Sequence, residues 1–318
     1  MTIDPAVATP FIDPEFADNL DVLPAVTEWS DAALTALRRQ RQEALASVEL
    51  SDEVLRTDHR VPGTDGAPDV TVRVHRPRDA EGPLPCVYSI HGGGYIVGTY
   101  EMEDARLDRW CSTLGCAAVA VDYRLAPETP YPGPLEDCYA GLRWVHRHAG
   151  ELGIDPARTG IAGASAGGGL AAALALLARD RGELPIAFQL LIYPMIDDRQ
   201  QTPSSRWDVP VWNPAANAYG WRAYLGERYG TEDVPATAAP ARALDLRGLP
   251  PAFVCVGTAD VFCSEDIIYA QRLVEADVQT ELHVYPGAPH GFDLLPGATG
   301  RRCRREVANW LGSRLAAP

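Results

Sequence analysis

From about residue 54 onward, short apolar runs alternate with segments of helical periodicity, and this alternation restricts the chain to few folds. Residues 84–90 and 116–123 are continuous apolar runs, as is typical of strands buried on both faces. Between them, residues 103–115 have helical spacing and end in glycine. Strands that alternate with helices in this way predict an α/β fold with a mostly parallel, doubly wound sheet.

Further segments extend this pattern in both directions. Residues 69–77 alternate strictly between apolar and polar side chains, so we expect an antiparallel strand with one exposed face. The other expected strands are residues 158–164, 186–194, 251–257 and 280–286, and the other expected helices are residues 134–150, the stretch after Ser165, and residues 264–276 and 300–315.

Two regions do not join the alternation, namely residues 1–50 and residues 197–245. The first contains an amphipathic helical stretch at residues 31–46, and the second is long, rich in proline and rich in aromatic residues. We predict that the two regions form a cap over the edge of the sheet where open α/β folds bind ligands. The core would then consist of residues 51–196 and 246–318.

Composition excludes several classes of function. The formal net charge of −15 argues against nucleic acids and anionic membranes as partners, because binding to them depends on Lys and Arg. All 28 basic residues are arginine, which excludes phosphate-loop lysines, Schiff-base and pyridoxal-phosphate enzymes, and Ser-Lys hydrolases. The 7 cysteines are scattered, without a C-x-x-C pair, so we expect reduced structural thiols and no metal site.

Neither a targeting segment nor a membrane span is expected. The first residues are acidic and interrupted by proline, with no basic and apolar signal pattern. The longest apolar stretch, around residues 170–178, is too short to cross a bilayer. These features predict a cytoplasmic protein.

A G-x-S-x-G motif at residues 163–167 makes Ser165 a candidate nucleophile. A short strand precedes the serine and a helix rich in small residues follows it, which is the context of a sharp strand-to-helix turn. The alternative is a glycine-rich phosphate-binding turn. It is disfavoured because the chain lacks lysine and lacks the G-x-G-x-x-G spacing.

A second glycine-rich stretch, HGGGY at residues 91–95, directly follows an expected central strand. It matches the loop that supplies oxyanion-hole amides in α/β-hydrolases. We predict that the backbone N–H groups of Gly92, Gly93 and Ala166 bind the oxyanion. His91 is interpreted as an anchor of this loop rather than as a base.

The other catalytic residues follow from chain order, which in α/β-hydrolases is Ser, then Asp or Glu, then His. Asp260 stands just after an expected buried strand, whereas Glu265 and Asp266 fall in the first turn of the next helix. Among the 7 histidines, His290 alone combines a loop position after the last strand with a glycine neighbour. The predicted triad is therefore Ser165, Asp260 and His290.

Several stretches resemble the bacterial hormone-sensitive-lipase-like esterases of the α/β-hydrolase fold. The resemblance covers nearly the whole chain and is carried by HGGGY, YRLAPE, GASAGG, RGLPPAFVCVGTAD and APHGF. Within that family the sequence looks most similar to the actinobacterial heroin-esterase-like carboxylesterases. The resemblance implies a catalytic α/β-hydrolase core with a two-part helical cap, and it implies that Arg124 and Glu128 brace the nucleophile and oxyanion loops.

The resemblance further implies a serine carboxylesterase that cleaves short- to medium-chain carboxylic esters through an acyl-enzyme intermediate. Such an enzyme needs no cofactor, takes a small-molecule ester as substrate, and in many family members forms a homodimer through a sheet edge. The substrate pocket is expected to depend on four aromatic residues, Tyr95, Trp207, Trp212 and Trp221. For each tryptophan, the alternative that it only attaches the insertion to the core stays open.

Two positions depart from the family pattern. Ala164 stands where the family usually has an acidic or polar residue before the nucleophile, and Ser264 replaces a second aspartate after Asp260. Two other functions stay open. One is hydrolysis of amides by the same triad, and the other is non-catalytic ligand binding on the same fold.

Overall fold

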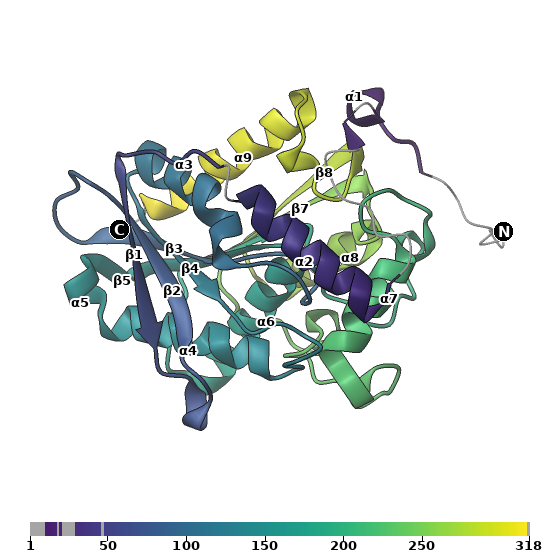
Figure 1. Ribbon diagram of the computed structural model, residues 1–318, viewed down its shortest axis with the longest axis horizontal. Coiled ribbons are helices and arrows are strands. Elements are labelled where there is room, and N and C mark those ends of the chain that lie inside the picture. Colours follow the sequence, from purple (N-terminus) through teal and green to yellow (C-terminus); the bar gives the residue numbers. More distant parts are fainter. Residues whose placement is uncertain (1–9, 18, 21–28, 46–47, 317–318) are drawn as a thin grey trace.

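Eight strands form one sheet in the part of the chain that the computed structural model describes, residues 10–17, 19–20, 29–45 and 48–316 (Figure 1). The strands are β1 (Val54–Val61), β2 (Val70–Pro77), β3 (Leu84–Ile90), β4 (Ala117–Asp122), β5 (Ile154–Ala164), β6 (Gln189–Ile192), β7 (Ala252–Ala259) and β8 (Thr280–Pro289). Their order across the sheet is β1-β2-β4-β3-β5-β6-β7-β8. β2 pairs antiparallel with β1 and β4, and all other neighbours are parallel, which confirms the predicted mostly parallel sheet.

The strands at the centre of the sheet are apolar because helices cover both of their faces. All residues of β6 are buried, as are all residues of β3 except Leu84. β1 was not predicted as a strand. It lies at the edge of the sheet, and the interior of its sequence VLRTDHRV is half-exposed or exposed, so it lacks the apolar run that marks the central strands.

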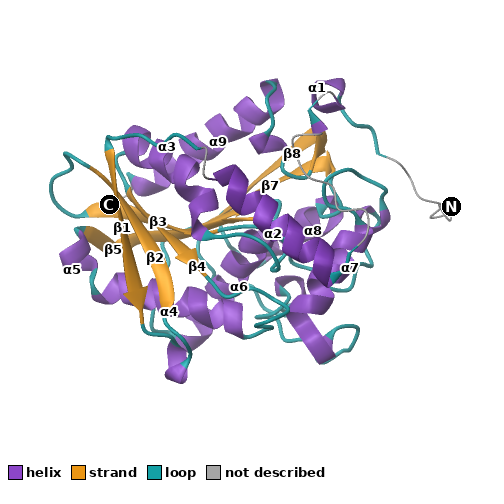
Figure 2. Cartoon of the chain, viewed as in Figure 1, coloured by secondary structure: helices purple, strands orange, loops and turns teal. Residues whose placement is uncertain are grey.

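Helices lie on both faces of the sheet (Figure 2). They are α1 (Pro14–Ala17), α2 (Asp31–Leu45), α3 (Asp104–Leu114), α4 (Gly133–Arg147), α5 (Ala149–Leu152), α6 (Ala166–Arg181), α7 (Pro214–Leu225), α8 (Cys263–Glu275) and α9 (Ala298–Leu315). α3 and α9 contribute to one hydrophobic cluster, and α4, α6 and α8 contribute to another on the opposite face. Short 3-10 segments are η2 (Thr64–Gly66), η3 (Tyr100–Glu103), η4 (Ser204–Arg206), η5 (Gly226–Arg228), η6 (Pro240–Arg242) and η7 (Phe292–Leu294). The doubly wound α/β architecture is therefore as predicted.

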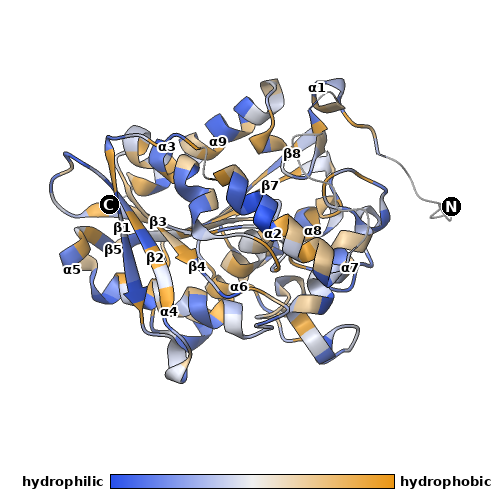
Figure 3. Ribbon diagram, in the orientation of Figure 1, coloured by the Kyte–Doolittle hydropathy of each residue, from blue (hydrophilic) through white to orange (hydrophobic). Residues whose placement is uncertain are grey.

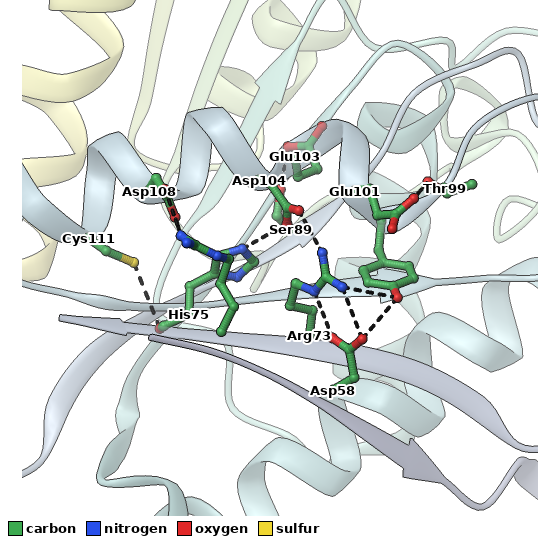
Figure 4. A network of polar contacts seen from close by, with 12 residues as sticks. Asp58, Arg73, His75, Ser89, Thr99, Glu101, Glu103, Asp104, Asp108 and Cys111 are labelled. Carbon is green, nitrogen blue, oxygen red and sulfur yellow. Dashed lines mark hydrogen bonds and ion pairs between the residues drawn. The ribbon is translucent and has the colours of Figure 1, made fainter. Parts of the chain in front are cut away.

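Ion pairs attach the antiparallel end of the sheet to α3 (Figure 4). Arg73 on β2 donates to Asp104 at 2.6 Å and to Asp58 on β1 at 2.7 Å. The buried His75 places its Nε2 2.9 Å from the second oxygen of Asp104. Because Asp104 is buried, these contacts supply the partners that a buried carboxylate needs. They fix the first turn of α3, which lies next to the site described below.

The N-terminal helix α2 crosses the centre of the molecule towards α7 (Figure 1). Much of it is hydrophilic, whereas the inner strands are mostly hydrophobic (Figure 3). Leu34 and Leu37 are its buried residues, and Trp29 just before the helix stacks on Tyr219 of α7 with ring centroids 4.9 Å apart. Both regions predicted to form the cap are thus in contact. Within the predicted N-terminal part, residues 1–9, 18, 21–28 and 46–47 lie outside the described residues.

The YRLAPE stretch holds α2 in place, although not as the resemblance implied. Arg38 of α2 donates to both carboxylate oxygens of Glu128, at 2.7 and 2.9 Å, and to the carbonyl oxygens of Ile96 and Ala126. Arg124 pairs instead with the buried Asp137 of α4. Glu128 therefore connects the core to the N-terminal helix, and Arg124 connects the end of β4 to α4.

Candidate active site

Ser165 sits on the sharp turn between β5 and α6. Its backbone has φ 58° and ψ −123°, which is an unusual conformation for a residue other than glycine. The turn is held by hydrogen bonds from the Ser165 amide to the Ile192 carbonyl and from the Met195 amide to the Ser165 carbonyl, both 2.9 Å long. A Cβ on Gly167 would come within 2.0 Å of the Ile90 carbonyl oxygen, so this position needs glycine. Serine at such a turn projects its hydroxyl away from the sheet.

The structure brings the three predicted triad residues together. Nε2 of His290 lies 2.9 Å from Ser165 Oγ, and Nδ1 of His290 lies 2.7 Å from Asp260 Oδ2. All three residues are buried. The other oxygen of Asp260 accepts a hydrogen bond from the amide of Phe262 at 3.0 Å, which fixes the carboxylate. This chain of contacts matches the hydroxyl, imidazole and carboxylate arrangement of an activated serine.

Two aromatic rings hold the His290 imidazole edge-on. The Tyr193 ring centroid lies 4.7 Å from it, and the Phe262 ring centroid lies 5.2 Å from it. The Tyr193 hydroxyl donates to the buried Asp293. Burial raises the pKa of Tyr193 well above its usual range, so this phenol stays neutral. The two ring contacts limit rotation of the His290 imidazole away from Ser165.

Gly92 and Gly93 face Ser165 across a shared cavity. A Cβ on Gly92 would lie 3.4 Å from the Ser165 Cβ, and Gly93 has φ 114°. Neither amide donates a backbone hydrogen bond among the described residues. Ala166 opens α6, where the first N–H groups have no partner within the helix. The three predicted oxyanion donors thus flank the nucleophile, on the loop after β3 and at the start of α6.

His91 lies beneath this loop and away from the triad. Its Nδ1 is 2.8 Å from the Gly92 carbonyl oxygen, and its ring stacks on Tyr123. Burial lowers the pKa of His91 to about 4, so the imidazole is neutral near pH 7 and donates through Nδ1. This is the anchor role expected from the sequence.

A cavity of about 140 Å³ opens above the triad. The core contributes Met102, Glu103, Arg106 and Tyr193, in addition to Gly92, Gly93, Ser165 and His290. The regions outside the α/β core contribute Trp29, Leu37, Arg41, Val211 and Trp212. Ala164, which departs from the family pattern, also lines the cavity, so a small methyl group borders it where the family usually has an acidic or polar side chain.

Of the four aromatic residues predicted for the pocket, the structure brings Trp212 to this cavity. Tyr95 and Trp221 are instead fully buried in the core, where Tyr95 stacks on Tyr224 and donates to the Met195 carbonyl. Trp207 is half-buried against both hydrophobic clusters. For Trp207 and Trp221, the structure shows the packing role that was left open as the alternative. For Tyr95, it shows packing in the core where a position in the pocket was expected.

The segment after Asp260 shows what the second departure does. The Ser264 amide donates to Ser204 Oγ at 2.9 Å, and the Ser204 amide donates to Ser264 Oγ at 3.3 Å. Ser264 therefore ties α8 to η4 in the 197–245 insertion. Glu265 accepts from the amides of Ile196 and Asp197, while both carboxyl oxygens of Asp266 are buried without a partner among the described residues. Burial raises the pKa of Glu265 and Asp266 well above their usual range.

Sequence reasoning missed a polar group on the core side of the cavity. Arg106 on α3 lies 3.5 Å from Glu103 and 3.3 Å from Asp293. Ser89, at the end of β3, donates to Glu103 at 2.8 Å (Figure 4). Asp293 could have been noticed, because it follows His290 by three residues in HGFD. Arg106 and Glu103 carried no such signal, since residues 103–115 have the spacing of an ordinary amphipathic crossover helix.

Three further observations concern the described part of the chain. There, no group of three or more His, Cys, Asp or Glu side chains is placed to hold a metal ion. No helix in the same residues combines the length and apolarity needed to traverse a bilayer. The 7 cysteines are buried and free, as expected for structural thiols.

The chain is similar to several known hydrolases. Residues 87–294 match a family described as alpha/beta hydrolase fold. The chain is 39% identical over 293 residues to Carboxylesterase NlhH of Mycobacterium tuberculosis, covering 91% of each protein. It is 35% identical over 307 residues to Esterase LipI of the same species, covering 94% of each. The solved structure of Bacterial Heroin Esterase is similar with a TM-score of 0.92 and 42% identity, covering 96% of this chain and 99% of that one.

Proposed function

The chain belongs to the alpha/beta hydrolase fold family, and on that premise we propose that it is a serine carboxylesterase acting on short- to medium-chain carboxylic esters. The similarity to named esterases agrees with the resemblance inferred from HGGGY, YRLAPE and GASAGG. The observation that carries the proposal is the aligned contact chain from Ser165 Oγ through His290 to Asp260, at 2.9 and 2.7 Å.

Acylation begins when His290 Nε2 takes the proton of Ser165 as Oγ attacks the ester carbonyl carbon. The carbonyl oxygen becomes an oxyanion, which the N–H groups of Gly92, Gly93 and Ala166 stabilise. The C–O bond to the alcohol then breaks, and His290 Nε2 gives its proton to the departing alkoxide. Asp260 holds Nδ1–H and stabilises the imidazolium.

Deacylation repeats these roles with water. His290 Nε2 takes a proton from water, the resulting hydroxide attacks the acyl carbon, and the second tetrahedral intermediate collapses to release the acid. The proton that His290 took from water passes to Ser165 Oγ as the acyl–oxygen bond breaks, which restores the free enzyme. The scheme is supported by the cavity that Gly92, Gly93, Ser165 and His290 line together.

The proposal also covers the role of the cap regions, the oligomeric state of the protein and its cellular location. Residues 1–50 and 197–245 act as a cap, which is supported by the cavity-lining side chains of Trp29, Leu37, Val211 and Trp212. We further propose a homodimer formed through a sheet edge, as the family resemblance implies, and a cytoplasmic location, as the sequence predicts. Light scattering after gel filtration would report the mass in solution, and a monomer there would exclude the dimer.

The test is hydrolysis of p-nitrophenyl esters from acetate to palmitate by the wild type and by Ser165→Ala. We expect a Ser165-dependent rate that is highest for short chains. Matched anilides measured in parallel distinguish an amidase, because a preference for the anilide would reverse the assignment. If the wild type is no faster than Ser165→Ala on any ester, the esterase proposal fails.

A further inference from the structure

Arg41 lines the same cavity as Ser165 and has no charged partner among the residues that the structure describes. It lies on α2, one turn after Leu37, and both side chains line the cavity that contains Ser165 and His290. Nε of Arg41 is shielded from solvent and has no hydrogen-bond partner within the described part of the chain. Among the described residues, the Arg41 guanidinium forms no ion pair.

The other arginine that lines the cavity, Arg106, provides a comparison, because it forms ion pairs within the protein. Arg106 is paired with Glu103 and Asp293, two buried carboxylates. Arg38, on the neighbouring face of α2, is likewise paired with Glu128. Arg41 alone of the three has no such acceptor in the residues that the structure describes, so packing of the helix does not account for it.

The composition of the chain makes this lack of a partner more informative. With 43 acidic and 28 basic residues, carboxylates are in excess, and an arginine that needed one for stability could have found one. A partly buried charge without a partner is unfavourable, and burial accordingly lowers the pKa of Arg41. An unsatisfied cation facing a binding cavity is instead expected where a ligand supplies the missing acceptor.

We propose that Arg41 binds a carboxylate carried by the ester substrate away from the scissile bond, and that the physiological substrates are therefore acidic esters. The inference rests on the proposed esterase function and deepens it by naming the substrate class. The surroundings fit a substrate that is apolar along its length and charged at one end, because Trp29, Leu37 and Trp212 line the same cavity. The guanidinium would form the charge-assisted hydrogen bonds with the carboxylate that nothing in the described protein supplies.

The test compares an acidic ester with a neutral ester of similar shape, using kcat/KM. One pair, p-nitrophenyl hydrogen adipate and p-nitrophenyl hexanoate, places the carboxylate on the acyl side. The other pair, p-acetoxybenzoate and phenyl acetate, places it on the alcohol side. The ratio of acidic to neutral kcat/KM is measured for the wild type, Arg41→Gln, Arg41→Lys and Arg39→Gln, with Ser165→Ala as the background. Arg39 is a matched control, since it lies on the same helix but is exposed and contacts Glu43 at 3.8 Å.

We expect Arg41→Gln to lower the ratio about 10- to 100-fold in at least one pair, as for loss of a hydrogen bond to a charged group. Arg41→Lys should keep part of the ratio, and Arg39→Gln should stay within about twofold of the wild type. The pair whose kcat/KM ratio falls shows whether Arg41 binds a carboxylate on the acyl side or on the alcohol side of the substrate. A ratio in Arg41→Gln within about twofold of the wild type for both pairs overturns the inference.

Two further readouts separate the possible failures. If the wild type does not hydrolyse the neutral esters faster than Ser165→Ala, the esterase function itself is wrong. If Arg41→Gln does not fold, inhibition of the wild type decides the question without a variant. Within at least one pair, adipamate against hexanamide or p-hydroxybenzoate against phenol, the acidic compound should then inhibit p-nitrophenyl hexanoate hydrolysis at about tenfold lower concentration than its neutral partner. Equal inhibition within both pairs overturns the inference.

Discussion

The imidazole of His91 lies flat on the phenol ring of Tyr123, with ring centroids 4.1 Å apart and planes inclined by 13°. The Tyr123 hydroxyl reaches back and donates to the His91 carbonyl at 2.9 Å. The two residues thus fix the start of the HGGG loop from the end of β4. This arrangement needs a neutral imidazole, because the site is fully buried and offers no acidic partner among the described residues.

Acid should therefore destabilise the protein through His91. Its pKa is lowered from 6.5 to about 4 in the folded chain, so between these pH values the unfolded chain binds a proton that the folded chain does not. The contribution of neutral His91 to the free energy of unfolding is fully present above pH 6.5. It is lost as the pH falls towards 4, by about 3 kcal/mol in total. Urea unfolding at pH 7 and pH 4.5 measures the loss. His91→Asn, which retains a donor near Nδ1, should lose about 2–3 kcal/mol less between these pH values. An equal loss in the variant would contradict the assignment.

Asp260→Asn should lower kcat on p-nitrophenyl acetate by about 10⁴-fold, because an amide favours the wrong tautomer of His290. Folding should be retained, since asparagine is isosteric and can still accept from the Phe262 amide. Asp266→Asn is the matched control, because Asp266 is an equally buried acid nearby that makes no hydrogen bond to His290. Steady-state kinetics with thermal melting of both variants checks this prediction. Similar losses of kcat in both variants would contradict a specific role of Asp260, because removal of either buried carboxylate would then have the same effect.

The fold could be predicted because its central strands are apolar on both faces, and that pattern is visible in sequence. β1 was missed for the same reason, since an edge strand with exposed residues carries no apolar run. The order of Ser165, Asp260 and His290 was accessible because each residue follows a strand directly, and the carboxyl ends of parallel strands meet at one edge of the sheet.

Side-chain direction in the pocket could not be predicted. Tyr95 and Trp221 are aromatic residues in the expected regions, yet they point into the core, and residue type alone does not determine which way a side chain points. Arg41 and Trp29 reach the cavity only because α2 folds back over the sheet. That placement depends on contacts such as Arg38 with Glu128, which are remote in sequence.

Gly93→Ala should impair the oxyanion loop specifically. Gly93 has φ 114°, and an added Cβ would come within 1.9 Å of the Val97 carbonyl oxygen, so the loop must shift. We expect kcat to fall about 10²–10³-fold, as for loss of one oxyanion donor, with a smaller change in KM. Gly66→Ala is the control, because Gly66 also has positive φ but no atom within 4 Å of the added Cβ. If both variants keep full kcat, Gly93 does not belong to the oxyanion hole.

The contact of Arg38 with Glu128 should contribute to stability mainly through Arg38. Glu128 is 62% exposed, so loss of its charge in Glu128→Gln should cost only about 0.5 kcal/mol. Arg38→Met should cost more, about 1–2 kcal/mol, because the carbonyl oxygens of Ile96 and Ala126 also lose their donor. Arg38→Met should in addition raise KM, since α2 carries cavity-lining residues and Ile96 follows the oxyanion loop.

A double-mutant cycle measured by urea unfolding isolates the ion pair from these backbone contacts. The coupling energy between Arg38 and Glu128 should be about 0.5 kcal/mol and should shrink in high salt, because the carboxylate is exposed. The rest of the Arg38→Met loss should not depend on salt, because it comes from hydrogen bonds to carbonyl groups. If Arg38→Met changes neither stability nor KM, then α2 is held over the site by its apolar contacts alone, through Leu34, Leu37 and the stacking of Trp29 on Tyr219.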